Sequence, residues 1–389
     1  MRDSRPSVWG TREGPPRELA ALETPVPIVD LDRMAHNLDR MAAYAALHGL
    51  ALRPHVKTHK APRVAAEQMR LGAVGLTCAT ARELEVMGDV ARDLLLAYPP
   101  VGGPRLARLV ALPDALRLTV GLDSAEAARE LSRAAEGAGR RIGVYVELDV
   151  GMHRVGVAGA DEAVALARTV ADLPWLRYSG VMFYPGHVRS PVGEQGAPLR
   201  ALSETLGVTL DALERAGLPA GTVSGGSTPA AWRMHEVAGV TEVRPGTYVY
   251  NDRATAALGA CDWDDCALTV LATVVSTAVP GQAVIDAGSK ALGREPLPAA
   301  PDGDAGGAGD AGFGALLDRP DVVVRSMSEE HGILDLSATS WRPAIGEQVR
   351  VVPNHVCIVV HLHEAVYGVR NGAVETSWPV AARGRERPY

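Results

Sequence analysis

The chain of 389 residues has only four cysteines, and they are scattered. A disulfide framework needs a denser set, so we exclude a disulfide-stabilised secreted scaffold and expect a reducing, cytoplasmic setting. Aromatic residues are also rare, at 4% of the chain with two Phe. The core must therefore be packed mainly by Val, Leu and Ala.

Long apolar segments are missing too. No apolar run approaches the roughly 20 residues that a membrane helix needs, and none follows the polar residues 1–6. We therefore expect neither a membrane span nor a signal peptide. An excess of basic residues is also absent, because the net charge is -7. This charge favours solubility and gives no basis for binding nucleic acid or a membrane surface.

What the chain does have is an ordinary globular composition, with 47% apolar and 22% charged residues. Its length exceeds that of one hydrophobic core, which indicates two domains. From residue 26 onward, β-rich runs alternate with helical stretches such as 35–48, 63–71 and 81–87, a pattern typical of a parallel sheet. Counted from residue 50, the predicted strands are 50–57, 73–78, 94–98, 116–121, 142–149, 178–184, 221–224 and 243–250.

Eight strands are the number of a closed (β/α)8 barrel, the TIM-type fold. An open, doubly wound sheet is the competing topology, and the run 26–30 is surplus to the count. After residue 252, short β runs at 268–275, 282–286, 321–325, 348–352 and 357–362 predict an antiparallel β domain without long helices. We therefore predict a barrel over 27–254 and a β domain over 255–389 together with 1–26. The Gly-, Ala- and Asp-rich stretch 299–314 is predicted to be a surface loop.

Lys57 lies between His55 and His59 at the end of the first predicted barrel strand. Functional residues of such barrels occupy the carboxyl ends of the strands. Lysine is seldom buried, and a desolvated amine loses its proton and becomes a nucleophile that can form an imine. The alternative is a surface lysine in a basic loop, since Arg53 and Lys60 are close in sequence.

Three further motifs follow predicted barrel strands. In residues 148–156, Arg154 can hold an anionic oxygen, or it can pair with Asp149 and steady the turn. Residues 224–229 combine Gly with Ser and Thr, a composition that lets backbone N–H groups and hydroxyls hold a phosphate, although a plain Gly-Gly turn is the alternative. Residues 243–248 end the eighth strand, and phosphate sites of barrels often follow strands seven and eight.

His355 and Cys357 form the last candidate pair. In a strand, residues i and i+2 point to one side, so the two side chains could bind one metal ion. Imidazole and thiolate suit zinc best, and two protein ligands leave positions open, as in a catalytic site. His361 and His363 lie roughly 20 Å or more along the strand from His355 and are not expected to join it. The alternative is a buried cysteine beside a capped histidine.

Taken together, these motifs resemble the fold-type III pyridoxal-phosphate enzymes, most closely the branch of D-threonine aldolase and D-serine dehydratase. Residues 53–60 are similar to the cofactor-lysine motif of that branch, and 286–292 and 328–332 resemble further signatures of it. Residues 148–156 and 243–248 look like segments of the broader alanine racemase group. The resemblance covers roughly residues 23–380.

The resemblance implies a role for each candidate. Lys57 would hold pyridoxal 5'-phosphate as an imine, Arg154 would face the phenolic oxygen of the ring, and Arg244 would lie near the pyridine nitrogen. Tyr184 would lie against the ring or at the mouth of the site. The remaining cofactor-binding residues, mostly around the phosphate, would be Ser224, Gly225, Gly226, Ser227, Gly246, Thr247 and Tyr248.

The metal pair distinguishes the branches. His355 and Cys357 match the dehydratase form of the pair, whereas the aldolases usually carry a carboxylate at the second position and the alanine racemases lack the pair. Residues 183–187, which include His187, match neither branch and leave the substrate open. The metal is expected to be zinc, with manganese or magnesium as alternatives.

The predicted function is a lyase that acts on a small D-amino acid with a β-hydroxyl group, which the metal binds as a Lewis acid. Lys57 would be the base at Cα for dehydration, and His187 a base for the hydroxyl in aldol cleavage. A racemase and a non-catalytic cofactor-binding protein are the alternatives. The resemblance also implies a homodimer.

Overall fold

The computed structural model describes residues 17–297 and 311–385. The described residues form two compact units: an α/β unit with residues 40–246 and 382–385, and a β unit with residues 17–39, 247–297 and 311–381. Residues 40–246 of the α/β unit lie inside the predicted barrel range of 27–254, whereas residues 382–385 were predicted to belong to the β domain. Most of the predicted loop 299–314 lies outside the described residues.

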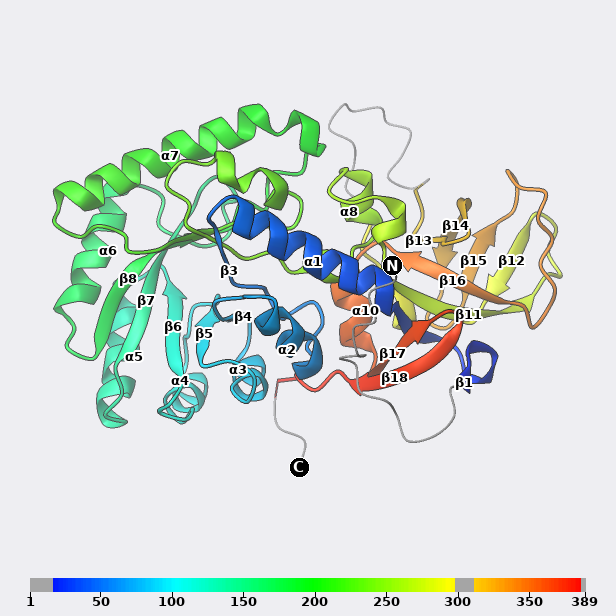
Figure 1. Cartoon of the computed structure of the whole chain (residues 1–389), viewed down its shortest axis with the longest axis horizontal. Helices are drawn as coiled ribbons and strands as arrows, with labels where there is room; N and C mark the ends of the chain where they lie inside the picture. Colours follow the sequence, from blue (N-terminus) through cyan, green and yellow to red (C-terminus); the bar gives the residue numbers. More distant parts are fainter. Residues whose placement is uncertain (1–16, 298–310, 386–389) are drawn as a thin grey trace, which may run out of the picture. The chain divides into compact units, whose positions relative to one another are not determined.

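Among the described residues, the α/β unit contains one eight-stranded parallel sheet with the order β3-β10-β9-β8-β7-β6-β5-β4 (Figure 1). A parallel bridge between His55 and Thr77 joins the two end strands, and the Thr77 N–H donates to the Pro54 carbonyl at 2.9 Å. The sheet is therefore closed, and the predicted barrel is confirmed over the open sheet. The strands are β3 (Ala51–Leu52), β4 (Leu76–Cys78), β5 (Asp93–Leu96), β6 (Arg117–Leu122), β7 (Ile142–Leu148), β8 (Leu176–Phe183), β9 (Val223–Gly225) and β10 (Glu242–Val243).

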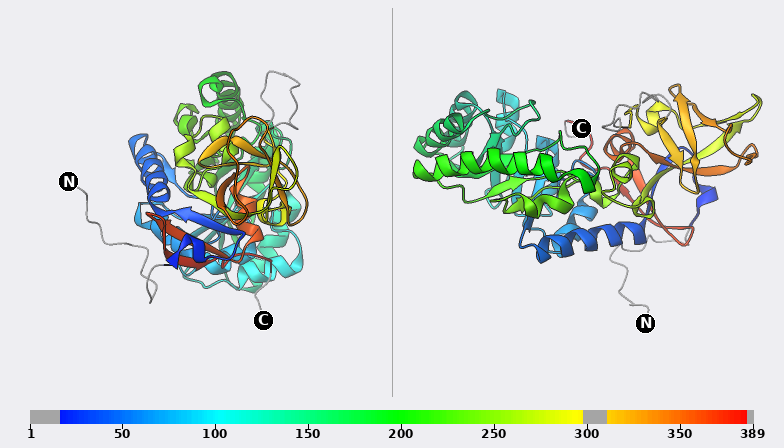
Figure 2. Two further views of the ribbon diagram at one scale, coloured as in Figure 1. Left: turned by 90° about the vertical axis from the view of Figure 1, so that its right-hand side faces the viewer. Right: turned by 90° about the horizontal axis from the view of Figure 1, so that it is seen from above.

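Helices cover the outside of this sheet (Figures 1 and 2). Because both faces of the strands are covered, the strands are nearly continuous apolar runs, and every residue of β7 is buried. Side-chain caps fix two helix starts: Thr80 accepts from the Glu83 N–H and Ser124 from the Ala127 N–H. The helices are α2 (Pro62–Arg70), α3 (Ala81–Met87), α4 (Gly103–Val110), α5 (Ala125–Gly137), α6 (Ala160–Asp172), α7 (Gly196–Arg215) and the second half of α1 (Leu31–Leu47), whose residues up to Asp39 belong to the β unit. No helix in the described part of the chain has the length and apolar character needed to cross a membrane.

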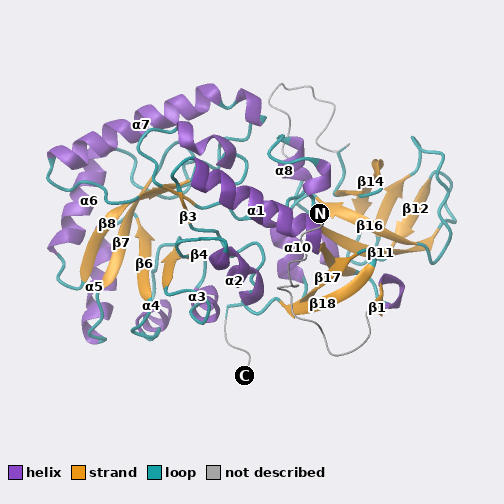
Figure 3. Ribbon diagram, in the orientation of Figure 1, coloured by secondary structure: helices purple, strands orange, loops and turns teal. Residues whose placement is uncertain are grey.

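The β unit contains a ten-stranded sheet among the described residues, with the order β1-β18-β17-β2-β11-β12-β15-β14-β13-β16 (Figure 3). An additional pairing of β11 with β16 closes the last six strands into a barrel. The predicted run 26–30, which was surplus to the eight barrel strands, is β2 of this unit, and it pairs with β11 and β17. The strands are β1 (Arg17–Glu18), β2 (Val26–Asp30), β11 (Leu268–Ser276), β12 (Gln282–Ile285), β13 (Gly314–Leu316), β14 (Arg319–Met327), β15 (Gly332–Asp335), β16 (Gln348–Pro353), β17 (Ala365–Arg370) and β18 (Ala373–Pro379).

One predicted strand is wrong. Residues 357–362 belong to helix α10 (Val356–Leu362), and His355 is its N-cap residue. The run is rich in β-branched residues, which favoured a strand. However, Val356, Val359 and Val360 are buried at the i, i+3 and i+4 spacing of a helix face. Two shorter helices, α8 (Arg253–Ala257) and α9 (Ser289–Leu292), also lie in this unit.

The eighth barrel strand is also shorter than predicted. The sequence predicts a strand over 243–250, but β10 ends at Val243 and residues Thr247–Val249 form a single 3₁₀ turn. Pro245 has no N–H to donate, which stops the parallel ladder at this point. The chain then leaves the barrel at Gly246 and continues as the β unit from Thr247.

Candidate active site

Lys57 lies in the turn that follows β3, at the carboxyl end of the strand, where the sequence predicted it. Its Nζ is 5.7 Å from the centroid of the Tyr184 ring, and the guanidinium of Arg154 is 4.9 Å from the same centroid. Tyr184 follows β8 and Arg154 follows β7. Three loops of the barrel thus bring three predicted site residues together around one aromatic ring.

The three lysines of the chain have different surroundings. Lys60 is buried and pairs with Glu83, and Lys290 pairs with Glu329 and Glu330, each at 2.8 Å. Lys57 is half-buried and makes no ion pair with any described residue. In the described chain, Lys57 is therefore the lysine whose amine has no carboxylate partner.

Both histidines beside Lys57 are kept neutral. Burial, with the positive charges of Lys57 and Arg244, lowers the pKa of His55 far below its ordinary value. Burial lowers the pKa of His59 to about 3, and its Nδ1 accepts a hydrogen bond from the Ala61 N–H at 3.2 Å. The lysine turn therefore carries little charge besides that of its two lysines.

The lowered pKa of His59 predicts that the stability of the fold depends on pH. The pKa is about 3 in the fold and about 6.5 in the unfolded chain, so the unfolded chain binds more protons between these values. The contribution of neutral His59 is fully present above about pH 6.5 and is lost as the pH falls toward 3, at about 1.4 kcal/mol per pH unit. Urea unfolding at pH 7 and pH 5 should show a loss of about 2 kcal/mol that His59→Asn removes. An equal loss in that variant would assign the acid sensitivity to other groups.

Arg244, which directly follows the eighth strand, is buried. Its Nη2 donates to the Phe183 carbonyl at 2.6 Å, while its Nε has no hydrogen-bond partner among the described residues. Burial lowers the pKa of Arg244, and the nearby carboxyl of Glu147 opposes this shift. Burial in turn raises the pKa of Glu147, and Arg244 and Arg154 oppose that shift.

Sequence reasoning missed Glu147. The signal was available, because Glu147 is the single charged residue in β7 (Ile142–Leu148), a strand that is otherwise apolar apart from a glycine and a tyrosine. The structure shows that this charge belongs with Arg244 and Arg154. A carboxyl inside an apolar barrel strand therefore indicates a candidate site residue, as does a lysine at the end of such a strand.

The loop after β9 supplies the second set of predicted residues. Gly226 has φ +97°, which favours glycine, and a Cβ on Gly225 would clash with the Phe183 ring. The hydroxyl of Ser227 is buried and has no hydrogen-bond partner within residues 17–297 and 311–385. Thr228 Oγ1 accepts from the Gly246 N–H at 3.2 Å, which joins this loop to the one after β10.

The hydroxyl of Ser224, unlike that of Ser227, has a carboxylate partner among the described residues. It is buried and donates to Glu242 Oε1 at 2.6 Å, within the barrel. Thr247 and Tyr248 follow Gly246 directly and belong to the 3₁₀ turn Thr247–Val249. Gly225, Gly226, Ser227 and Gly246 all lie on the α/β unit.

His187 and Arg154 lie on the loops after β8 and β7. His187 is exposed, and its ring covers Gly151, where a Cβ would be 3.3 Å from Nε2. Burial lowers the pKa of His187 and Asp149 opposes this shift. Asp149 pairs with His153 at 2.8 Å and not with Arg154 among the described residues. The structural alternative for Arg154, a turn-steadying pair with Asp149, is therefore wrong.

The β unit holds the predicted metal pair at the start of α10. The strand argument for the pair fails, because His355 is the N-cap and Cys357 the second residue of the helix. The two side chains are nonetheless in hydrogen-bond contact, and Cys357 and Asp252 raise the pKa of His355. Thr247 Oγ1 is 4.0 Å from Cys357 Sγ. In the described part of the chain, no cluster of three or more His, Cys, Asp or Glu residues is arranged to bind a metal.

Asp252 is a second residue that the sequence did not single out. It is fully buried, and its Oδ2 is 3.0 Å from His355 Nδ1 and accepts the Val356 N–H at 3.2 Å. A carboxylate that accepts from Nδ1 leaves Nε2 of the imidazole free to bind a metal. The residue lies 103 positions away in sequence, so no local pattern could have indicated it.

Comparison with known proteins identifies the family. Residues 29–254 match the alanine racemase N-terminal domain, and residues 267–369 match a serine dehydratase domain. The chain is 33% identical to D-threonine aldolase of Arthrobacter sp over 95% of both chains. The chain belongs to the D-threonine aldolase and D-serine dehydratase branch of the alanine racemase-like enzymes.

Other members of this branch differ in reaction. The chain is 36% identical to D-threo-3-hydroxyaspartate dehydratase of Delftia sp. strain HT23, over 87% of this chain and 92% of that protein. The crystal structure of D-threonine aldolase from Filomicrobium marinum superposes with a TM-score of 0.83 at 37% identity, covering 95% and 99% of the two chains. Alanine racemase of Bacillus anthracis, at 15% identity and a TM-score of 0.68, shares the fold alone.

Enzymes of this branch depend on pyridoxal phosphate, and the residues of the α/β unit fit that group. The cofactor needs an amine, donors for a phosphate and a partner for its ring nitrogen. Lys57 provides an amine without an ion pair among the described residues, and Ser227 and Arg244 each have a buried polar atom without a partner there. Among the described residues, these three groups thus have the donor and amine chemistry that the cofactor needs.

Proposed function

We propose that this chain is a pyridoxal-phosphate- and metal-dependent lyase that acts on β-hydroxy D-amino acids. The observation that carries the proposal is Lys57, the lysine without a carboxylate partner in the described chain, at the carboxyl end of a barrel strand beside Tyr184 and Arg154. The proposal assigns the cofactor to the α/β unit and the metal to His355 and Cys357 of the β unit. Zinc suits this pair of donors best.

Each candidate residue of the α/β unit would contact a different part of the cofactor. Lys57 would hold the cofactor, Ser227 with the loop glycines would bind its phosphate, Arg244 would face its ring nitrogen and Arg154 its phenolic oxygen. When bound, the cofactor supplies an electron sink for the substrate carbon next to the nitrogen. Lys57, released when the substrate binds, would then hold or remove the proton at Cα, and the exposed His187 would take the proton of the substrate hydroxyl.

The relatives support a metal at the second pair. Structures of D-threo-3-hydroxyaspartate dehydratase include a histidine-to-alanine variant and a cysteine-to-alanine variant in the metal-free form. The two substituted positions of that enzyme are two residues apart, as are His355 and Cys357. A metal at this pair would polarise the β-oxygen of the substrate as a Lewis acid.

The contact between Asp252 and His355 predicts how metal affinity is set. Asp252→Asn keeps the size of the side chain but removes the carboxylate that fixes the imidazole orientation, so we expect zinc affinity to fall about 10- to 100-fold. Competition with a chromophoric chelator measures this affinity directly. Asp252 caps helix α8 and Asp262 caps the 3₁₀ turn Trp263–Asp265 of the same unit, so Asp262→Asn is the control and should leave the affinity unchanged. Equal affinities for all three proteins would remove Asp252 from the metal site.

Product analysis distinguishes the possible reactions. The purified protein is incubated with D-threonine, D-serine and D-threo-3-hydroxyaspartate, with and without a chelator. Glycine plus an aldehyde indicates aldol cleavage, and a keto acid plus ammonia indicates dehydration. Appearance of the L-isomer, together with activity that survives replacement of His355 and Cys357, would support the racemase alternative. Absence of reaction with every β-hydroxy D-amino acid would contradict the lyase proposal.

The predicted homodimer is tested separately. Light scattering of the purified holoenzyme gives its mass in solution, which we expect to be twice that of the 40.9 kDa chain. A monomeric mass with full activity would contradict this expectation.

A further inference from the structure

Gln195 is a fully buried glutamine that directly precedes α7. Glutamine is mostly exposed in folded proteins, whereas Gln195 is 0% exposed. Its Nε2 donates to two main-chain carbonyls, those of Ser190 and Pro229, each at 3.0 Å. A side-chain amide has two N–H donors, so this contact uses both of them. The opposite orientation of the amide would place its oxygen against the same two carbonyls, which fixes the assignment.

The two carbonyls belong to different loops of the α/β unit. Ser190 lies in the loop after β8, which begins at Tyr184. Pro229 lies in the loop after β9, two residues after Ser227. Gln195 therefore joins the loop that carries Tyr184 to the loop that carries Ser227, and both loops belong to the proposed cofactor site.

The carbonyl of Pro229 is bound differently from its neighbours. The Ala231 N–H donates to the Thr228 carbonyl at 3.2 Å, and the Arg233 N–H donates to the Ala230 carbonyl at 3.1 Å. Both contacts are local turns of the backbone. The Pro229 carbonyl between them accepts from a side chain 34 positions away in sequence. A main-chain carbonyl withdrawn from water needs a donor, so the conformation of this loop depends on Gln195.

The rest of the loop is already held by contacts of its own. The Arg244 N–H donates to the Gly225 carbonyl at 3.0 Å, and Thr228 Oγ1 accepts from the Gly246 N–H at 3.2 Å. These two contacts fix the loop on the side of β10. The contact with Gln195 fixes it on the side of β8, so Ser227 lies in a backbone segment that is held from both sides.

We infer that Gln195 is a positioning residue for the phosphate loop of the cofactor site. It holds the Pro229 carbonyl and thereby keeps the backbone around Ser227 in one conformation. A loop that is ordered before binding loses less freedom when it binds the phosphate, so the affinity is higher. Gln195 acts through the loop, and the inference rests on the proposed function because it takes the phosphate of pyridoxal phosphate as the ligand of that loop.

Pyridoxal 5'-phosphate and unphosphorylated pyridoxal test this inference. Both carry the aldehyde that would form an imine with Lys57, but only the first carries a phosphate. Titration of the full-length, cofactor-free protein, followed by visible absorbance, gives a Kd for each compound. Gln195→Met removes both donors and nearly keeps the side-chain volume, so the Kd of pyridoxal 5'-phosphate should rise about tenfold or more. The Kd of pyridoxal should change less than about twofold, because it makes no phosphate contact.

Gln195→Asn is the second variant. It keeps the amide but shortens the side chain by one methylene, so it loses its reach to Pro229 and should shift the ratio of the two Kd values in the same direction. We expect the variants to fold, because Arg233 Nη1 also links the two segments by donating to the Val192 carbonyl at 3.1 Å. Failure of both variants to fold would assign Gln195 to the stability of the unit and overturn the inference.

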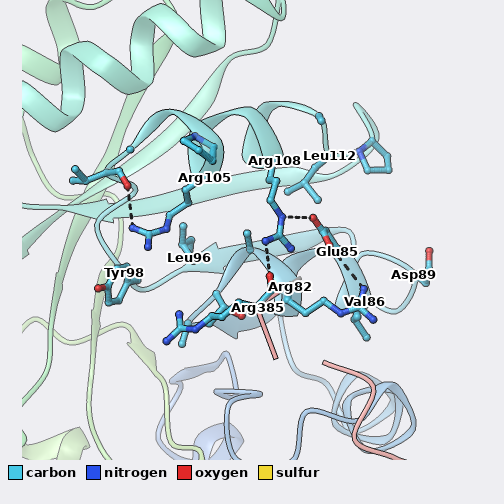
Figure 4. Close-up of a pocket in the computed structure, with 18 of the residues that line it drawn as sticks. Arg82, Glu85, Val86, Asp89, Leu96, Tyr98, Arg105, Arg108, Leu112 and Arg385 are labelled. Atoms are coloured by element: carbon cyan, nitrogen blue, oxygen red, sulfur yellow. Dashed lines mark hydrogen bonds and ion pairs between the residues drawn. The ribbon is translucent and has the colours of Figure 1, made fainter. Parts of the chain in front are cut away.

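Two control variants separate the loop from other effects. Thr209→Val removes a buried polar group of α7, whose hydroxyl donates to the Thr205 carbonyl at 3.1 Å. Arg105→Gln changes an arginine-lined groove between α3 and α4 (Figure 4), where positive charge could attract a phosphate without the loop. Gln195, Ser227 and Pro229 are not among the described residues that line this groove. Both controls should leave the ratio of the two Kd values unchanged.

The outcomes separate this inference from the proposed function. An equal loss of affinity for both compounds in Gln195→Met, or no loss for either, overturns the inference and leaves the proposed function intact. A change of the ratio in Arg105→Gln as large as that in Gln195→Met would move the phosphate to the groove and overturn the inference as well. Absence of imine absorbance with either compound in the unsubstituted protein would contradict the proposed function itself.

Discussion

Lys57→Ala should abolish the visible absorbance of the bound cofactor and lower kcat by about 10²- to 10⁴-fold or more. The expected loss follows from two roles of one amine, which would hold the cofactor and move the proton at Cα. Absorbance spectra after gel filtration in excess pyridoxal phosphate measure the first effect, and product formation from D-threonine or D-serine measures the second. Because Lys57 makes no ion pair with a described residue, the melting temperature of the cofactor-free protein should be unchanged.

Lys290→Ala is the control for this experiment. Lys290 is an exposed lysine of the β unit that pairs with Glu329 and Glu330, and its loss should leave the absorbance intact. Added methylamine should restore part of the activity of Lys57→Ala, because a small amine can replace the missing base. Retained absorbance in Lys57→Ala would show that another group holds the cofactor.

Arg53→Met should destabilise the protein by about 3–5 kcal/mol, the usual loss when one partner of a buried ion pair is removed. Arg53 directly follows β3 and is buried. Its Nε donates to Glu242 Oε2 at 2.8 Å and its Nη1 to Asp93 Oδ1 at 2.9 Å. Glu242 is only 2% exposed. The substitution would leave this carboxylate buried with the Ser224 hydroxyl as its remaining side-chain donor, whereas Asp93 would keep Arg117.

The urea midpoint of unfolding, followed by circular dichroism, measures this loss. The double variant Arg53→Met/Glu242→Met should recover most of the stability, because it removes both charges and keeps the volume. Arg129→Met breaks an exposed pair with Glu126 and should change the stability by less than about 1 kcal/mol. A loss below about 1 kcal/mol in Arg53→Met would show that water or another group solvates Glu242.

The barrel could be predicted because its signals are local. Each strand and helix has its own apolar pattern, and a parallel order follows from their alternation. The position of Lys57 follows in the same way, because a residue after a barrel strand lies at the carboxyl end of the barrel. The same logic predicted Arg154 and the Gly226–Ser227 loop, which the structure places after β7 and β9.

Errors arose where local preference and tertiary packing disagree. Residues 357–362 have the β-branched composition of a strand, but burial of Val356, Val359 and Val360 makes them a helix. The i, i+2 argument that placed His355 and Cys357 on one side of a strand therefore fails, although the two side chains are in contact at the start of the helix. Five strands, β1, β13, β15, β17 and β18, were not predicted, although β17 and β18 are an antiparallel pair joined by only two residues, 371–372.

The sequence by itself therefore determined the barrel class, the antiparallel second domain and the residues that carry a recognisable motif. Tertiary structure alone decided which polar groups are satisfied. It pairs the Ser224 hydroxyl with Glu242 and places Asp252 against His355. Among the described residues, it also leaves Lys57 without the carboxylate partner that Lys60 and Lys290 each have. The physical reason is that an apolar pattern repeats over a few residues, whereas the partner of a charge is set by contacts between residues far apart in the chain.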